Sequence, residues 1–327
     1  MWNDRGNFSF SRCLFFWLCN VMVKKGVTPI SKNNGAFLSV LITFGLAGII
    51  TLAKGLFQDW PQYTTKGIGW YVLAGILTAY IGRSLLFTSI QHLGSVRAST
   101  LKRLNSLFTV LIGVVFLHES MNLMVFSGMI MIFASSSFLM YETIISNRRL
   151  QKNETAAANE STVVKSNKNV NKSILWIKRF KLITSLGYMY GVVSALAYSV
   201  GYVVRKEGLS EIPDPFFGTM IGALVGILIF LIISLLKKTF QQSIVQTFTY
   251  FQPWLFAAGI ATSLGQILYF SALMFSDVSR VAIITSTDVI FTLILSAFTF
   301  KTHEGTSKTV YLAAIIAMIG AGFIVIG

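Results

Sequence analysis

The sequence predicts an all-α integral membrane protein with ten transmembrane helices, arranged as two five-helix inverted repeats. Three observations predict this fold class. The 327 residues are 54% hydrophobic and only 12% charged, whereas about 25% of the residues of a soluble domain are charged. The apolar runs are continuous and about twenty residues long, which is the length of a membrane-spanning helix. Several short motifs also recur at a nearly constant offset between the two halves of the chain.

The apolar runs predict helices and not a transmembrane barrel, because barrel strands alternate apolar and polar residues over about ten positions. The N-terminal run resembles a signal peptide, but it has no small-residue cleavage site before Lys24 and it has a counterpart in the second half. We therefore expect it to be the first span. The expected spans are 7–23, 35–53, 69–90, 96–117, 122–141, 184–204, 215–236, 253–274, 279–300 and 307–326.

A polar, basic connection divides the spans five and five. It carries nine Lys and Arg against three Glu and is rich in Asn, Ser and Ala, a composition typical of a flexible linker. We expect a first repeat over 1–141, a linker over 142–182 and a second repeat over 183–327.

The two halves match at offsets of 181 to 185 residues. Because each half has an odd number of spans, the second half enters the membrane in the opposite direction. Inverted repeats of this kind place a binding site near the midplane, between the halves. The matches include Trp70 with Trp254, Gly75 with Gly259, Thr78 with Thr262, Phe87 with Phe270, and His118-Glu119 with His303-Glu304.

The net charge of +15 does not indicate a nucleic-acid partner, because the basic residues lie mostly between spans, where they set topology and contact anionic lipid. Seven Lys and Arg fall on the side of the termini, Arg205 among them, and seventeen on the opposite side. This asymmetry predicts a cytoplasmic linker and termini on the outer side.

Two basic residues lie inside the expected span 96–117. Lys102 belongs to a polar stripe of this helix that also contains Asn105, and Arg103 lies beside the stripe. Ionisable residues inside a membrane are costly and are usually functional.

The counterpart span, 279–300, carries Asp288, which aligns with Asn105. Lys102 or Arg103 could pair with Asp288 if the two spans meet at the centre. Three interpretations remain open: a charged substrate pathway, a structural ion pair, and snorkelling of Lys102 and Arg103 to the headgroups.

Two further polar residues occupy matched spans. Arg83 lies in span 69–90 and Gln266 in span 253–274. Matched spans with polar side chains are natural cavity walls, so both residues are candidates for the substrate pathway, and a structural pairing of Arg83 is the alternative.

The sequence does not indicate an enzyme or a cofactor. It has no Gly-rich phosphate loop, Walker-type lysine or nucleophile elbow, which argues against ATP-driven transport and hydrolase activity. His92, His118 and His303 have no second His or Cys at ligand spacing, so we expect no metal site.

With these features the chain resembles the ten-span EamA-type branch of the drug/metabolite transporter superfamily. The resemblance covers nearly the whole chain. It rests on the five-plus-five repeat, on the ends of spans one and six (Val-Lys-Lys-Gly and Val-Arg-Lys-Glu-Gly) and on two matching signatures, Leu107–Glu119 and Ile290–Glu304. Neither signature has the proline that the family often has near its start, and the second has two extra residues before Glu304.

The resemblance implies a ten-helix bundle with a central cavity that exports or takes up small metabolites through an exchange or an ion gradient. It also implies that both termini are cytoplasmic, which is the opposite of what the charge count predicts.

Together these observations favour a secondary transporter of small organic metabolites in the cell membrane, with amino acids or related anionic or zwitterionic solutes as candidate substrates. The alternatives are an exporter of lipophilic cations and drugs, and a membrane scaffold that transports nothing. The expected partners are the solute, the lipid bilayer, and a proton or counter-substrate. The sequence leaves the oligomeric state open.

Overall fold

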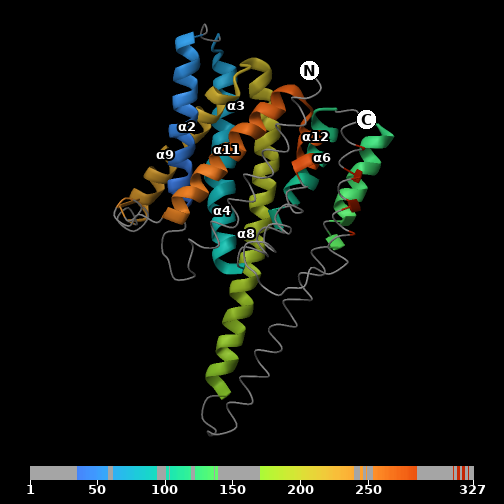
Figure 1. Cartoon of the computed structure of the whole chain (residues 1–327). Helices are drawn as coiled ribbons and strands as arrows, with labels where there is room; N and C mark the ends of the chain where they lie inside the picture. The colour runs from blue at the N-terminus through green and yellow to red at the C-terminus, as the bar shows by residue number, and fades with distance from the viewer. Residues whose placement is uncertain are drawn as a thin grey trace.

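The computed structural model is helical, without strands, in the residues that it describes (Figure 1). These are residues 35–57, 62–93, 101–102, 104–118, 122–135, 137–138, 170–238 and 253–285, with single positions and pairs within 244–248 and 312–323; for 170–185 only the backbone is described.

Five helices are long and apolar enough to cross a membrane. They are α2 (Ala36–Phe57), the continuous helix Thr65–His92, the Leu186–Glu211 part of α8 (Val170–Glu211), α9 (Pro215–Leu236) and α11 (Pro253–Phe275). The candidate span Thr65–His92 lies in a continuous helix made of α3 (Thr65–Gly75), the π-helical η1 (Ile76–Gly82) and α4 (Arg83–Leu93). Shorter helices are α6 (Leu104–Phe116), Leu123–Ser135 and α12 (Val278–Thr285).

These five helices coincide with five of the expected spans: 35–53, 69–90, 184–204, 215–236 and 253–274. The expected spans 96–117 and 122–141 contain the two shorter apolar helices, Leu104–Phe116 and Leu123–Ser135. Helix α12 covers the beginning of span 279–300, and the rest of that span, span 7–23 and most of 307–326 lie outside the described residues. The described helices thus have the lengths and composition of a multi-pass helical membrane protein, and the number ten stays a prediction.

Helix α8 is longer than its expected span and begins at Val170, within the expected linker 142–182. Its N-terminal part extends beyond the ends of the neighbouring helices (Figure 1). Hydropathy marks only the part of a helix that suits lipid, whereas the backbone hydrogen bonds of a helix continue into polar sequence.

A short connection joins α8 to α9, and Asp214 fixes the start of α9. The Asp214 carboxylate accepts hydrogen bonds from the backbone N–H groups of Phe216 and Phe217, at 2.9 and 3.1 Å. Pro215 occupies the first turn, where its missing N–H costs nothing. This capping satisfies two of the N–H groups that a helix leaves unpaired at its start.

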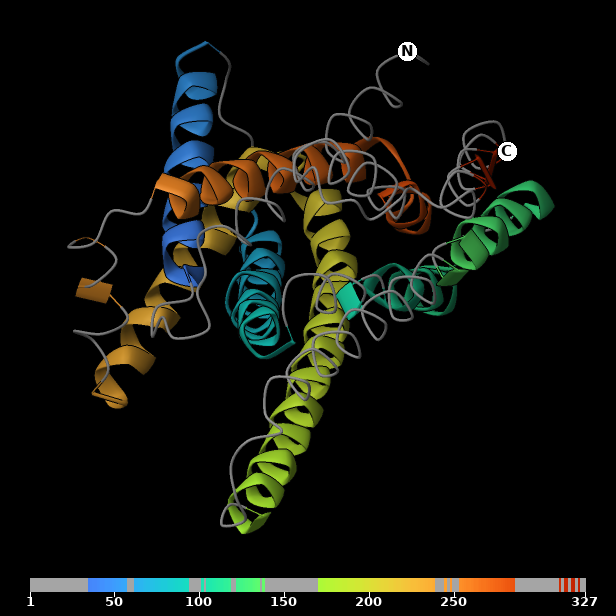
Figure 2. The same ribbon diagram turned by 60° about the horizontal axis from the view of Figure 1, so that its bottom comes forward.

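The two halves of the chain pack into each other, and their contacts are reciprocal. Helix α2 packs against its own counterpart α9, and α6 against its counterpart α12. Helix α2 also contacts α11, and in the equivalent pairing α9 contacts α3 and η1. Equivalent pairs of this kind are what a two-fold relation between repeats produces. Helix α8 lies against α3, η1 and α4 on one side and against α6 on another (Figure 2).

A row of glycines brings α9 close to α3 and η1. A Cβ atom on Gly75 would lie 2.7 Å from the Cα and the carbonyl oxygen of Gly222, and a Cβ on Gly226 would lie 2.8 Å from the Ala79 Cβ. The sequence pattern Gly218, Gly222 and Gly226 predicts close helix packing, as small-residue rows do in membranes, and the structure shows that α3 and η1 are the partners.

Candidate functional site

Arg83 is almost completely buried where the π-helical η1 passes into α4. It is 1% exposed, and its Nη1 donates to the hydroxyls of Ser39 (3.0 Å) and Thr43 (3.1 Å) on α2. Its Nη2 donates to the side-chain carbonyl oxygen of Gln266 on α11. One guanidinium thus connects α2 and α4 of the first half with α11 of the second, through neutral acceptors that satisfy most of its donors.

A second hydrogen bond between the halves lies directly beside Arg83. The hydroxyls of Thr43 and Ser263 are 2.8 Å apart and both are buried. π-helical turns such as η1 occur frequently at functional sites, and here the turn leads directly into the buried arginine.

Arg205 is a second buried arginine, on α8, and it is held less completely. It is 3% exposed, and its Nη2 donates to Thr78 Oγ1 on η1 at 3.3 Å. Its Cζ lies 3.2 Å from the centroid of the Phe270 ring, a cation–π contact. Among the described residues, Nε and Nη1 of Arg205 have no hydrogen-bond partner. Gly222 leaves room for the guanidinium, since a Cβ there would lie 2.8 Å from Nη2.

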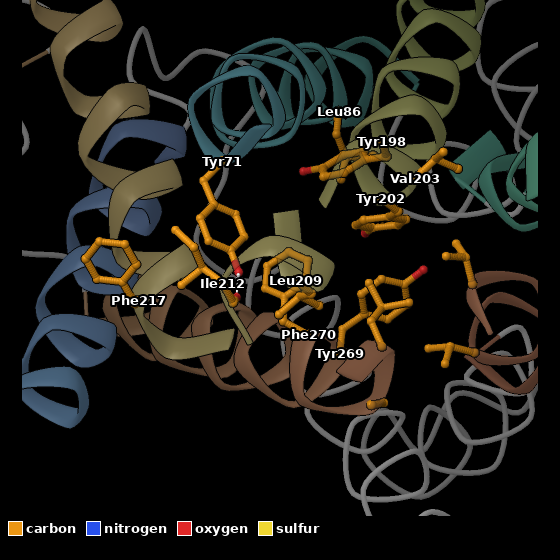
Figure 3. Packing of buried hydrophobic residues seen from close by; sticks show 14 residues of the cluster. Tyr71, Leu86, Tyr198, Tyr202, Val203, Leu209, Ile212, Phe217, Tyr269 and Phe270 are labelled. Atoms are coloured by element: carbon orange, nitrogen blue, oxygen red, sulfur yellow. Dashed lines mark hydrogen bonds between the residues drawn. The ribbon is translucent and has the colours of Figure 1, made fainter. Parts of the chain in front are cut away.

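Four aromatic side chains from α8 and α11, one of which is the Phe270 that contacts Arg205, lie close together (Figure 3). The ring centroids of Tyr202 and Tyr269 are 4.3 Å apart, and those of Tyr198 and Tyr202, and of Tyr269 and Phe270, are 5.9 Å apart. None of the four is more than 4% exposed. Charges interact more strongly in such apolar surroundings than in water.

No described carboxylate neutralises either arginine. The ion pairs that the structure records among its described residues lie near helix ends: Lys54 with Asp214 (3.0 Å), Lys66 with Glu211 (2.7 Å) and Arg280 with Asp277 (3.4 Å). Arg205 is hydrogen-bonded to Thr78 of η1, and Arg83 directly follows η1. The described core therefore carries two like charges between the halves.

A family model, the EamA-like transporter family, matches residues 8–141 and 185–326. The chain belongs to the EamA-like transporter family. Its members are membrane transporters of small molecules, which agrees with the multi-pass helical fold. The family model matches the chain as two segments, and Arg83 lies in the first, Arg205 and Gln266 in the second.

A solved structure entitled "Crystal structure of protein" supports the fold of this EamA-like transporter. It aligns with a TM-score of 0.63 at 12% sequence identity, covering 98% of this chain and 97% of that one. At this identity the likeness concerns the fold alone. No curated protein matches the chain.

The structure brings together two of the sequence-predicted site residues of this EamA-like transporter, Arg83 and Gln266. Asn105 is buried on α6, where its side-chain oxygen accepts hydrogen bonds from Ser199 of α8 (2.9 Å) and from Thr109 (3.2 Å). It thus joins α6 to α8, and the structure records no contact between Asn105 and Arg83.

The remaining predicted residues lie away from this contact or outside the described part. Lys102 is half-buried just before α6. Arg103 and Asp288 lie outside the described residues, so the pairing of Lys102 or Arg103 with Asp288 stays a prediction.

Sequence reasoning missed Arg205. The expected span ended at residue 204, so Arg205 counted as a loop charge, whereas α8 continues to Glu211 and buries the arginine. One signal was present: Arg205 follows Tyr202 by three residues, which places both on one helix face. Arg205 also belongs to the motif that is repeated at the end of span one.

Proposed function

We propose that this chain is a secondary transporter of small organic solutes that carry an anionic or zwitterionic group. The solute passes between the two halves, along a path that includes Arg83 and Gln266. Amino acids and related metabolites have the required charges, and a proton or a counter-substrate drives the movement.

One observation carries the proposal: Arg83 is fully buried and hydrogen-bonded across the halves to Gln266. An intramembrane charge is costly, and in transporters it marks a substrate or ion pathway. The acceptors around Arg83 are neutral hydroxyl and amide oxygens. A solute anion can replace such acceptors as the halves move, which would couple binding to the conformational change.

The sign of the charge separates this function from the export of lipophilic cations. Two buried guanidinium groups repel a cation, and an exporter of cations needs an acid in its pathway. Among the described residues, the core between the halves carries arginine and no acid beside it. The proposed substrate is therefore an anion or a zwitterion.

Flux into proteoliposomes tests the proposal. Full-length protein should carry radiolabelled amino acids or organic acids down an imposed gradient. Arg83→Gln should lower the initial rate at least about tenfold, since hydrogen bonds to a charged group contribute about 1.5–3 kcal/mol each. Arg280→Gln, which changes an arginine of a helix-end pair, is the matched control and should leave the rate unchanged.

Two results would contradict the proposal. Wild-type rates in both Arg83→Gln and Gln266→Leu would remove these residues from the pathway. Folded wild-type protein that carries no tested solute under any gradient would favour a membrane scaffold.

A further inference from the structure

We infer that Arg205 is the primary anion-binding group of the transporter and that it takes a carboxylate of the solute. The inference rests on the proposed function and deepens it, because it names a different arginine from Arg83 and a chemical class of ligand. The inference depends on which N–H donors of each guanidinium have no hydrogen-bond acceptor among the described residues.

Arg83 is largely occupied by the protein itself. Both of its terminal nitrogens donate to protein oxygens, and Nε is the one Arg83 nitrogen without a partner among the described residues. A solute that binds Arg83 has to displace hydrogen bonds that already exist. Before a solute binds, Arg83 therefore connects the halves, and a solute reaches it only by displacing these hydrogen bonds.

Arg205, in contrast, makes few hydrogen bonds to the described part of the protein. Its single recorded hydrogen bond, to Thr78, is long at 3.3 Å, and both Nε and Nη1 lack a partner in the described part of the chain. A buried polar group without a partner is destabilising, and a charged one more so. An acceptor supplied by a solute removes this cost, so the binding energy is concentrated at Arg205.

The surroundings of Arg205 favour a carboxylate. The Phe270 ring covers the guanidinium at 3.2 Å, so acceptors approach from its edge. A carboxylate is planar and accepts hydrogen bonds in the plane of a guanidinium. The nearby Tyr202 and Tyr269 rings are buried, and they exclude the water that would otherwise weaken the pair.

The position of Arg205 also suits a transport site. It lies on α8 of the second half and donates to Thr78 on η1 of the first half, while its guanidinium fits against Gly222 of α9. A carboxylate bound there would sit where both halves meet, and Arg83 lies at the end of the same π-helical segment. The second positive charge would further favour an anion over its neutral analogue.

Ligand-induced thermal shifts of the purified full-length protein test the inference. The probes are benzoate and acetate, with benzamide and acetamide as neutral isosteres and phosphate as an anion of different shape. Benzoate and acetate should stabilise the wild type more than their amides and more than phosphate.

Arg205→Gln should weaken carboxylate binding at least about tenfold and leave the response to the amides unchanged. Arg205→Lys should bind weakly, because it keeps the charge without the planar donors, and Arg280→Gln should behave as the wild type.

Three outcomes would overturn the inference. One is that neither carboxylate stabilises the wild type more than its amide. Another is that the carboxylate affinities of Arg205→Gln equal those of the wild type. The third is that Arg205→Gln unfolds and Asp288→Asn restores it, which would identify an internal ion pair in place of a solute site.

Liposome flux separates this inference from the proposed function. Flux that requires Arg83 but not Arg205 would support the proposed function and overturn the inference. Carboxylate binding at Arg205 without any flux would support the inference and overturn the proposed function.

Discussion

At the scale of single residues, the buried charges in the described part of this chain are stabilised in three different ways. Arg83 is surrounded by neutral hydroxyl and amide oxygens, and Arg205 is covered by an aromatic ring. Asp214 is stabilised most completely, since it caps α9 through two backbone N–H groups and pairs with Lys54 at 3.0 Å. A charge that is capped and paired like Asp214 is structural. A charge with unpaired donors, such as Arg205, is a place where a ligand can contribute more binding energy.

Asp214 should accordingly matter for stability. We expect Asp214→Ala to lower the free energy of unfolding by about 2 kcal/mol through loss of the cap and of the ion pair, and Asp214→Asn to cost less because the amide oxygen still caps. The Glu211→Ala control removes the partner of the exposed Lys66 at the C-terminal end of α8 and should cost less than about 1 kcal/mol. Denaturant unfolding in detergent measures all three, and equal losses for Asp214→Ala and Glu211→Ala would contradict this view.

Sequence reasoning places Arg83 and Gln266 deep inside apolar spans that align between the halves, and the structure brings the two side chains into contact; their role in transport stays a prediction. Sequence reasoning does not predict the burial of Arg205 because hydropathy ends a span at a charge. Hydropathy does not report whether a side chain near a helix end points to water or turns into the core. That direction depends on helices distant in sequence, here η1, α9 and α11, which contribute Thr78, Gly222 and Phe270.

At the scale of elements, the contact between α3 and α9 was likewise predicted only in part from the sequence. The four-residue spacing of Gly218, Gly222 and Gly226 predicts close packing, but the spacing does not identify the partner helix. The structure identifies Gly75 on α3, whose missing side chain lets the two backbones touch. Hydropathy also did not predict the full length of α8, because its first residues are helical without being apolar.

Gly75→Ala should separate α3 from α9. The added Cβ would lie 2.7 Å from backbone atoms of Gly222, which cannot move as a side chain can, and such overpacking costs about 1–3 kcal/mol. Gly45→Ala is the matched control, because its Cβ meets nothing within 4 Å and alanine favours a helix by about 1 kcal/mol. Thermal unfolding in detergent should therefore shift downward for Gly75→Ala and not for Gly45→Ala, and a downward shift of equal size in both would contradict the packing explanation.

At the scale of the whole molecule, the halves are joined by reciprocal helix pairs. Two helices pack against their own counterparts, α2 against α9 and α6 against α12. The contact of α2 with α11 also has an equivalent, the contact of α9 with α3 and η1. The repeat read from the sequence predicts two related halves, but motif matching does not show which helices meet. Several buried hydrogen bonds cross from one half to the other, including Arg83 to Gln266 and Thr43 to Ser263. If one half moves against the other during transport, these are the contacts that break.

A reversible crosslink tests that motion. In a variant with Cys13 and Cys19 replaced by Ser, the pair Thr43→Cys and Ser263→Cys should form a disulfide, since the native hydroxyls are 2.8 Å apart and a disulfide needs Cβ atoms about 4 Å apart. The bond would tie α2 of the first half to α11 of the second. Oxidation should stop solute flux in proteoliposomes, and reduction should restore it. The two single cysteine variants should be insensitive to oxidant, and they also show how far loss of each hydroxyl alone alters the rate. Full flux through the oxidised, crosslinked protein would mean that solute crosses without separation of the halves at this contact.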